Sequence, residues 1–576
     1  MVSSAATIVL AKKGNLLGGT GPGESGRATS TFSSSMIARS AAREPFLRIP
    51  PFPKARVRAF IEAAAAPVDA SVLAGALRRL RVGGSYWAAQ PHLPADHVLV
   101  RTAAATDAVQ RSLPGHPIVV WEEAGGLTGP SGATAVVSGE CDPWHMLAGA
   151  IALVGDADDE VSLIAALLGI PCYALDPVRN EVTPVSVDAA AMLGELAASG
   201  FEDPFTGASL DALQAAELCG FWRRLVDSNR DIAAGVGFAF WKQNHVAPLL
   251  WGGTNPLPFR RSADLLMQDQ AIALWRVKAG RGLVAELERK GSRLIEVEDG
   301  FLRSRGLGAD CIPPLSITVD RLGAHFDPAR PSELELLLQD GEFDEALLDR
   351  ARDLRRLIVE AGIGKYECGI KALDRPAGKR RHVLVPGQVE DDRAVQAGGC
   401  GLTSNLDLLE RVRKQAPDAY ILYKPHPDVL AGHRRGAMPD ASCLRYADEI
   451  VGELPIASLI GMVDEVHVNT SLAGFEALLR DKQVTTYGVP FYAGWGLTSD
   501  LGPVPARRTA RRTIDELVAA TLLQYPRYLD PVTGLPCPAE VIVARLNGGE
   551  ERDAGVVVGM RRLQGKLMRR LRRLVQ

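Results

Sequence analysis

The feature that most constrains this chain is an alternation of short β-branched runs with segments of helical periodicity. In the first half, strands are predicted at His97–Arg101, Pro117–Trp121 and Ala150–Val154. From about residue 265 the alternation predicts helix Asp264–Gln270, strand Ala271–Val277, helix Gly282–Lys290, strand Arg293–Val297, and strands His382–Pro386, Ala419–Tyr423 and Glu465–Val468. Such alternation indicates an α/β layer structure, and two successive open parallel sheets fit best.

The length of 576 residues predicts several packed units rather than one. Composition shifts divide the chain into a Ser- and Gly-rich leader (1–45), a first α/β unit (46–235), two further α/β domains (236–380 and 381–545) and a basic tail (546–576). The leader has too little apolar surface to offset the cost of ordering. Its Gly18–Gly26 run lacks the Gly-Lys-Ser/Thr that would make it a phosphate loop.

Composition excludes several classes of function. The net charge of -3 offers no global attraction for nucleic acid. The eight cysteines form no CxxC pair, so we expect reduced thiols and no metal site. The apolar stretch Ala5–Ala11 is too short for a signal peptide, and no apolar run approaches the ~20 residues of a membrane span. These features predict a cytoplasmic protein, soluble or peripheral on a membrane.

Part of the first unit resembles part of the last domain. Asp142–Gly155 followed by Ser162–Tyr173 can be aligned with Leu454–Val468 followed by Ser471–Leu479. A second pair follows downstream, FEDPFTG at 201–207 against YLDPVTG at 528–534. We infer that the first unit is a partial, diverged copy, although any two Rossmann-like strand–helix units share some similarity.

Two acidic clusters follow predicted strands, where open α/β sheets gather ligands. Glu298–Ser304 (EDGFLRS) places adjacent carboxylates before a glycine and an arginine, which suits acid/base work or sugar binding, or a solvated turn with a local ion pair. Pro386–Asp392 (PGQVEDD) places three acids in a row, whose mutual repulsion raises pKa values unless something compensates it. A carboxylate nucleophile or base is favoured there over a metal site.

Two further clusters suit anions. In Tyr423–Asp428 (YKPHPD), prolines on both sides of His426 hold it in an extended turn beside Lys424. In His467–Leu479, Thr470 and Ser471 can cap a helix that carries Glu476. The run Thr485–Thr498 has the glycine and aromatic content of a base-stacking loop.

Together these motifs resemble the capsule polysaccharide biosynthesis family, the KpsC-type retaining β-Kdo transferases, over roughly residues 240–540. The segments that carry the resemblance are Glu298–Ser304, Pro313–Ser316 with Asp320, Val385–Asp392, Tyr423–Asp428, Asn469–Leu479 and Gly488–Thr498. The resemblance implies a GT-B fold preceded by the diverged copy, with 236–380 as acceptor-side domain and 381–545 as donor domain. It also implies CMP-Kdo as donor, a lipid-linked oligo-Kdo acceptor on phosphatidylglycerol, and retention through a carboxylate adduct. No metal or other cofactor is expected.

The resemblance also implies roles for individual residues. The nucleophile falls at Asp392, with Asp391 as rival, and Glu298 becomes the acid/base. His426 is also counted among the catalytic residues, through contact with the donor. On the donor side, the predicted binding residues are Gln388, Lys424, His426, Asn469, Thr470, Ser471 and Glu476. On the sugar or acceptor side they are Asp299 and Arg303.

Typical members carry two complete transferase modules, and this chain departs from that pattern. The first unit lacks counterparts of the acidic and Lys-Pro-His-Pro motifs, and Asp158–Ser162 replaces the Asn-Thr-Ser turn. The position aligned with Glu476 is Ala165, which is apolar. We therefore expect residues 46–235 to be an inactive unit with a structural or acceptor-side role, which argues against synthesis of both linkages. The sequence leaves open whether the linkage formed is 2,4 or 2,7.

The tail Met560–Gln576 has seven basic residues, no acid and a leucine stripe, which suits an anionic inner membrane or a partner protein. We expect peripheral association with that membrane and with the capsule assembly and export complex. The alternatives are a GT-B transferase with another nucleotide-sugar donor and a non-catalytic scaffold of capsule assembly and export.

Overall fold

A computed structural model describes residues 45–549 except 123–131, 305–311, 366–367, 370, 372, 376–377, 379, 432–433 and 453. The predicted leader, except for residue 45, and the tail beyond residue 549 lie outside the described residues. The described chain forms two compact units. Unit 1 contains residues up to 50, 59–203 and 207–223, and unit 2 contains residues 51–58, 204–206 and those from 224 onward.

Unit 1 is built on a six-stranded sheet with the order β3-β2-β1-β4-β5-β6. Its strands are β1 (His97–Val100), β2 (Ile118–Glu122), β3 (Ala135–Ser138), β4 (Ala150–Val154), β5 (Cys172–Asp176) and β6 (Glu181–Pro184). Only β6 runs antiparallel to its neighbour. The remaining elements are α1 (Ala70–Leu80), α2 (Thr106–Ser112), α3 (Pro143–Met146), α4 (Glu160–Leu168), α5 (Ala189–Ala197), and the hairpin β7 (Gly200–Glu202) and β8 (Ser209–Asp211), followed by α6 (Ala212–Asp227).

Unit 2 contains a seven-stranded sheet, here called the N-terminal sheet, with the order β10-β9-β11-β12-β13-β20-β21. Its strands are β9 (Ile232–Val236), β10 (Phe259–Arg260), β11 (Ala271–Leu274), β12 (Arg293–Asp299), β13 (Ser316–Asp320), β20 (Pro526–Leu529) and β21 (Pro536–Cys537). Strands β9 to β12 are parallel, whereas β13, β20 and β21 are joined antiparallel, so this sheet is mixed rather than parallel as expected. The helices α7 (Phe240–Val246), α8 (Arg276–Ala279) and α9 (Arg281–Arg289) follow its parallel strands.

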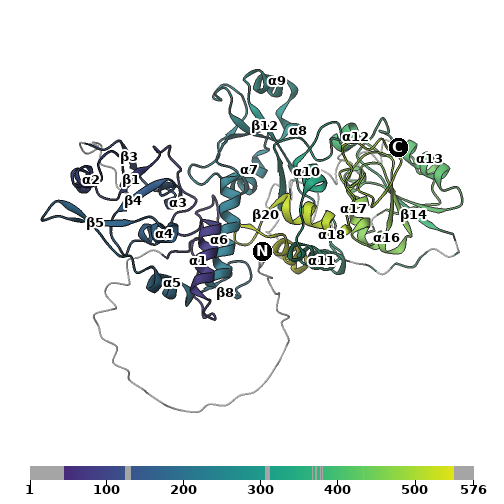
Figure 1. The fold of residues 1–576 in the computed structure, drawn as a ribbon. Helices are drawn as coiled ribbons and strands as arrows, with labels where there is room; N and C mark the ends of the chain where they lie inside the picture. The colour runs from purple at the N-terminus through teal and green to yellow at the C-terminus, as the bar shows by residue number, and fades with distance from the viewer. Residues whose placement is uncertain are drawn as a thin grey trace, which may run out of the picture. The chain divides into compact units, whose positions relative to one another are not determined.

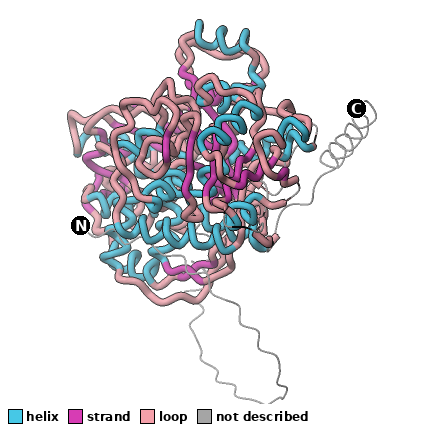
Figure 2. The backbone as a smooth tube through the Cα atoms, turned by 90° about the vertical axis from the view of Figure 1, so that its right-hand side faces the viewer, coloured by secondary structure: helices cyan, strands magenta, loops and turns pink. Residues whose placement is uncertain are grey.

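The second sheet of unit 2, here called the C-terminal sheet, has the order β16-β15-β14-β17-β18-β19 and is parallel throughout. Its strands are β14 (His382–Pro386), β15 (Tyr420–Lys424), β16 (Glu449–Ile450), β17 (Glu465–Val468), β18 (Gln483–Thr486) and β19 (Ser499–Asp500). Every residue of β14 is buried, as its uninterrupted apolar run predicts for a strand covered on both faces. Figure 1 shows β14 in green and β12 in teal, and Figure 2 separates the strands from the helices and loops.

The end of the described chain belongs to the N-terminal sheet. After helices α10 (Glu333–Asp340), α11 (Glu345–Glu360) and α18 (Ile514–Val518) and a π-helix (Ala519–Gln524), β20 pairs with β13, and α19 (Ala539–Gly548) follows β21. The predicted domain 381–545 assigned residues 526–545 to the C-terminal sheet. That assignment was wrong, because β20 pairs with β13 of the N-terminal sheet. The predicted boundary at 235/236 lies inside β9, which pairs with β11, so it also has to move.

The predicted internal repeat is supported by topology. Counted from the first strand of each, unit 1 and the C-terminal sheet share the order 3-2-1-4-5-6. Helix α3 precedes β4, as α16 (Ile456–Met462) precedes β17. The matched DPxTG segments both lie in antiparallel hairpins, β7–β8 and β20–β21, and a helix follows each. A generic Rossmann-like unit does not include this hairpin and helix, so their presence in both copies favours a common origin of the two copies.

Candidate active site

The four predicted clusters meet at one cavity of about 550 Å³ in unit 2. It is lined by residues at the carboxyl ends of β12, β14, β15 and β17, which belong to both sheets. The carboxyl ends of parallel strands are where open α/β sheets bind ligands. The following predicted site residues line it: Glu298, Asp299, Arg303, Gln388, Asp392, Lys424, His426, Thr470, Ser471 and Glu476. Asp391 and Asn469 are not among its lining residues.

Glu298 lies in β12 itself, which is two residues longer than the predicted strand. The Glu298 side chain is 17% exposed and forms an ion pair with Arg393. Burial raises its pKa to about 7, and Asp299 and Glu296 add to the rise, while Arg393 and Lys242 oppose it. A carboxyl group with a pKa near neutrality can both give and accept a proton, as acid/base catalysis requires.

Asp299 lies in the opposite electrostatic environment. Its Oδ1 accepts a hydrogen bond from Lys242 Nζ at 3.0 Å and its Oδ2 accepts one from Arg303 Nε at 2.9 Å. Burial alone would raise its pKa, but the charges and hydrogen bonds of Arg303 and Lys242 outweigh that effect and the pKa of Asp299 is lowered. Asp299 is therefore a permanent anion, and Arg303 also donates to Ser304 and to the Ile312 carbonyl.

The three consecutive acids have separate partners, so they do not form the mutually repelling cluster that the sequence suggested. Glu390 Oε1 accepts from the Asn405 N–H at 3.0 Å, and Asp391 lies 3.3 Å from Arg434 Nη2. Asp392 caps helix α12 (Arg393–Gly398) and accepts from the Ala394 N–H at 3.0 Å. Since only Asp392 of these three lines the cavity, the geometry favours it over Asp391 for contact with a substrate.

Lys424 is the last residue of β15, and His426 lies two residues beyond it, at the carboxyl end where the sequence placed both. Lys424 Nζ donates to the carbonyls of Leu454 at 2.6 Å and Gly452 at 3.2 Å. His426 caps the short helix α14 (Pro427–Leu430), where its Nδ1 accepts from the Asp428 N–H at 3.1 Å. Burial, together with Lys365, Arg434 and Lys424, lowers the pKa of His426 to about 4 although Asp392 opposes this. The imidazole is thus neutral near pH 7, with its proton on Nε2.

The turn after β17 is held by Gln388. The Gln388 amide donates to Thr470 Oγ1 at 2.9 Å and accepts from the Thr470 N–H at 3.0 Å. Asn469 is buried and donates to the Leu402 carbonyl at 2.7 Å, which gives it a structural place. Ser471 caps α17 (Leu472–Leu478), and Glu476 of that helix accepts from the Lys365 N–H at 2.9 Å.

Several lining residues were missed by sequence reasoning. Lys242 Nζ lies 3.5 Å from the centre of the Trp275 ring, but α7 carries no motif that marks it. His325 lies among Phe301, Phe491 and Tyr525, and burial, with Lys365 and Arg393, lowers its pKa to about 3. The only usable signal was a lone histidine between apolar residues.

The predicted base-stacking loop is largely core. Tyr492 and Trp495 are fully buried, and the Trp495 indole donates to the Phe491 carbonyl at 2.8 Å. Of the aromatic residues in this run, only Phe491 lines the cavity. The expectation of a stacking loop was therefore wrong for Tyr492 and Trp495, because their aromatic surface is used in packing.

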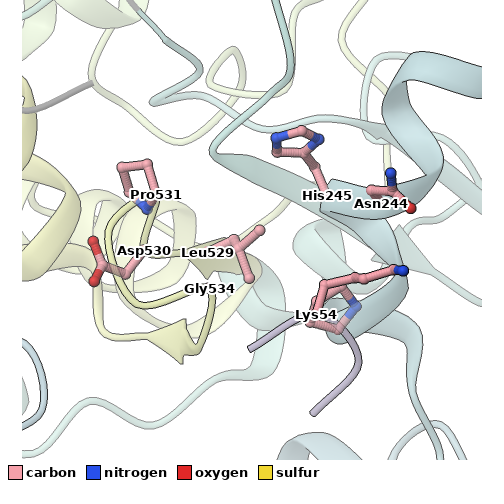
Figure 3. A pocket seen from close by; sticks show the side chains of 8 residues that line it. Lys54, Asn244, His245, Leu529, Asp530, Pro531 and Gly534 are labelled. Carbon is pink, nitrogen blue, oxygen red and sulfur yellow. The ribbon is translucent and has the colours of Figure 1, made fainter. Parts of the chain in front are cut away.

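A second, smaller cavity of about 220 Å³ also lies in unit 2. Figure 3 shows Lys54, Asn244 and His245 on one side of it and Asp530 and its neighbours on the other. The Asp530 carboxylate accepts hydrogen bonds from Thr533 and Arg545 and so serves the DPxTG turn. This cavity lacks the pair of carboxylates that the larger one contains, and the larger one is the candidate active site.

The corresponding edge of the unit 1 sheet carries different chemistry. Arg101 follows β1, stacks 4.1 Å from the Trp121 ring centre and lies 3.6 Å from Asp159, which caps α4. An acid thus stands where Ser471 caps α17. Counted from these caps, the counterpart of Glu476 is Ile164 rather than the expected Ala165, and it is also apolar and buried.

Within the described ranges, no group of three or more His, Cys, Asp or Glu residues could hold a metal ion. No helix in the same ranges is both long and apolar enough to cross a membrane. The basic tail on which the membrane prediction depends lies beyond residue 549, outside them.

The sequence profile described as "Capsule polysaccharide biosynthesis protein" matches residues 270–528. The capsule polysaccharide modification protein LipA of Neisseria meningitidis serogroup B is 38% identical over 346 residues, which are 59% of this chain and 49% of LipA. The lipopolysaccharide-processing protein LpsZ of Rhizobium meliloti is 43% identical over 265 residues, 45% of this chain and 60% of LpsZ. A solved structure described as "Thermosulfurimonas dismutans KpsC, beta Kdo 2,4 transferase" is 31% identical, with 55% of this chain and 98% of that one covered and a TM-score of 0.48.

The chain spans about half the length of LipA. The matched residues 270–528 contain every cluster that lines the larger cavity, from Glu298 to Glu476. This chain belongs to the capsule polysaccharide biosynthesis protein family.

Proposed function

We propose that this chain is a retaining β-Kdo transferase that moves Kdo from CMP-Kdo to a lipid-linked acceptor in capsule synthesis. The observation that carries the proposal is that Glu298, from β12 of the N-terminal sheet, and Asp392, from the segment after β14 of the C-terminal sheet, line one cavity. Two Rossmann-like sheets that share a ligand cavity are the arrangement of a GT-B transferase. Family membership and the 31% sequence identity to a KpsC protein described as a β-Kdo 2,4 transferase support the choice of sugar.

In the first displacement, the Asp392 carboxylate attacks the anomeric carbon of Kdo and the bond to the CMP phosphate oxygen breaks. CMP leaves as an anion and needs no proton from the protein. In the second displacement, an acceptor hydroxyl attacks the same carbon, its proton passes to Glu298, and the bond to Asp392 breaks. Two inversions give net retention. The pKa of Glu298 near 7 lets it accept that proton at neutral pH.

The donor carries a phosphate and a carboxylate, and the cavity offers Lys242, Lys365, Lys424 and Arg434 to anions. Thr470 and Ser471, next to the Gln388 amide, are proposed to face the phosphate, and Glu476 the ribose hydroxyls. Neutral His426 would donate a hydrogen bond from Nε2 to the donor. These contacts need no metal ion, so we propose metal-independent transfer.

Peripheral attachment to the inner membrane and contact with the capsule assembly and export machinery are also proposed, because a lipid-linked acceptor lies at that surface. The support is the basic, leucine-striped tail at Met560–Gln576. Since unit 1 lacks the acid pair, we propose a single active module that makes one linkage, 2,4 or 2,7.

The test is CMP release from CMP-Kdo with a synthetic Kdo-lipid acceptor, with NMR of the product to read the linkage. We expect Asp392→Ala to lower kcat by at least about a thousandfold, because it removes the nucleophile. Asp391→Ala is the matched control and should stay within a few fold of the wild type. Turnover of a UDP-sugar but not of CMP-Kdo would show that the donor is a UDP-sugar. No turnover of either would favour a non-catalytic scaffold.

A further inference from the structure

Arg393 occupies an unusual place between the two sheets of unit 2. It is the first residue of α12 and directly follows Asp392, which caps that helix. A cation on the first residue of a helix faces the positive end of the helix dipole, which is locally unfavourable. Its position is therefore better explained by what the side chain contacts than by the stability of α12.

The Arg393 side chain contacts β12 of the N-terminal sheet. Its Nη1 donates to Glu298 Oε1 and lies 3.5 Å from Glu296 Oε2. Its guanidinium carbon lies 4.9 Å from the centre of the Phe326 ring. Two carboxylates and an aromatic face thus fix the guanidinium, and the side chain is 27% exposed. One residue connects the carboxylate proposed as nucleophile with the carboxylate proposed as base.

We propose that Arg393 is the positioning residue of this site and ties the Glu298 carboxylate of β12 to the helix that Asp392 caps. The inference rests on the proposed roles of Glu298 and Asp392. A guanidinium can hold two acceptors in a fixed plane, whereas a lysine offers a point charge on a flexible stem. Arg393 thereby sets where the Glu298 carboxylate lies during the second displacement, without touching the reacting atoms itself.

The same contact sets when Glu298 can act. The charged groups that face Glu298 are Arg393 from α12, Lys242 from α7, and Asp299 and Glu296 from β12 itself. Arg393 and Lys242 lower the pKa of Glu298, and the two acids raise it. Without Arg393, burial and the two acids would be opposed by Lys242 alone, so the pKa of Glu298 would rise. A base with a higher pKa needs a higher pH to become ionised.

The test compares Arg393→Gln, Arg393→Lys and the control Arg276→Gln, which removes a partner of Glu296 that does not bond to Glu298. For Arg393→Gln we expect kcat to fall at least about tenfold with KM within about threefold, and the acidic limb of the pH–rate profile to move up by at least about one unit. Arg393→Lys should restore the limb but only part of kcat. Arg276→Gln should keep the wild-type kcat and the wild-type position of the acidic limb.

The pKa of Glu298 can also be measured without turnover. In protein labelled with carboxyl-13C glutamate, the Glu298 signal is assigned from its absence in Glu298→Gln. We expect its titration midpoint to rise by about one to three units in Arg393→Gln. An unchanged midpoint in folded Arg393→Gln overturns the inference, as does a kcat loss that Arg276→Gln reproduces. If the midpoint is raised in Arg393→Gln but the wild type turns over no donor, the effect of Arg393 on Glu298 stands and the proposed function is refuted.

Discussion

At the scale of the residue, two neighbouring carboxyl groups are driven to opposite protonation behaviour. Burial raises the pKa of Glu298 to about 7, while Arg303 and Lys242 overcome burial and lower the pKa of Asp299. Pairs of acids whose pKa values are pushed apart are how one site obtains an acid/base group and a permanent anion. The sequence showed the pair, but Lys242, which helps to separate their pKa values, lies 57 positions from Asp299.

The raised pKa of Glu298 has a cost in stability that can be measured. Between its ordinary value of 4.5 and about 7, the folded state binds more protons at Glu298 than the unfolded state. The free energy of unfolding therefore falls as pH rises through this window. Glu298→Gln removes the effect, so the difference in Tm, mutant minus wild type, should be larger at pH 8 than at pH 5. Calorimetry at both pH values checks this, and an equal difference would contradict it.

At the scale of the element, strands with uninterrupted apolar runs were the most predictable part of the fold. The bounds expected for β4 and β14 agree with the structure, and so do those of β17, although Glu465 and His467 interrupt its apolar residues. For β14, burial of every residue explains this, because a strand that is covered on both faces is marked by a continuous apolar run. The clusters at the ends of β12, β14, β15 and β17 were predicted to bind ligands because open α/β sheets bind ligands at the carboxyl ends of their parallel strands, and this is how most of the cavity lining was predicted.

Other elements depended on contacts distant in sequence. The expected helix Asp264–Gln270 is a series of turns in which Leu266 is buried while Leu265 and Met267 are exposed. Lys290 Nζ donates there to the carbonyls of Ala263 and Leu266, a contact that local periodicity does not encode. The pairing of β20 with β13 likewise joins residues about two hundred positions apart. Propensity and periodicity are local signals, so they missed both.

The approach of β14 to β15 gives a test at this scale. A Cβ on Gly387 would lie 2.6 Å from Tyr423 Oη and 3.2 Å from two of its ring carbons. We expect Gly387→Ala to destabilise the protein by about 1 to 3 kcal/mol through overpacking, and Tyr423→Phe in the double variant to recover part of it. Thermal unfolding measures both.

The control for this pair is Gly461→Ala in α16, where a Cβ would meet nothing within 4 Å. That variant should be neutral or stabilised by up to about 1 kcal/mol. A Gly387→Ala protein as stable as Gly461→Ala would show that β14 and β15 are not packed as closely as described.

At the scale of the whole molecule, the described residues contain one fold pattern twice and one candidate active site. Unit 1 and the C-terminal sheet share strand order, and each sequence carries a downstream DPxTG hairpin followed by a helix. In unit 1, however, the Arg101–Asp159 ion pair and the apolar Ile164 stand at the positions of the polar turn and Glu476. The sequence predicted acids in place of the Asn-Thr-Ser turn and an apolar residue opposite Glu476, and the inactivity of unit 1 stays a prediction.

One site per chain makes a stoichiometric prediction. Isothermal titration should show one CMP bound per chain, because unit 1 has an acid where a phosphate would approach. Glu476→Ala should weaken CMP at least about tenfold by removing the proposed ribose partner. Asp159→Asn, the matched change in unit 1, should leave both affinity and stoichiometry unchanged. Two CMP per chain would show that unit 1 also binds nucleotide.

In the proposed mechanism, Asp392 forms a covalent bond to Kdo and Glu298 serves the second displacement. Intact-protein mass spectrometry after incubation with CMP-Kdo, without acceptor, tests it most directly. We predict an added Kdo mass on the wild type, on Asp391→Ala and on Glu298→Gln, and none on Asp392→Ala. In Glu298→Gln the adduct should persist when acceptor is added. An adduct that survives Asp392→Ala, or one lost only in Asp391→Ala, would rule out Asp392 as the nucleophile.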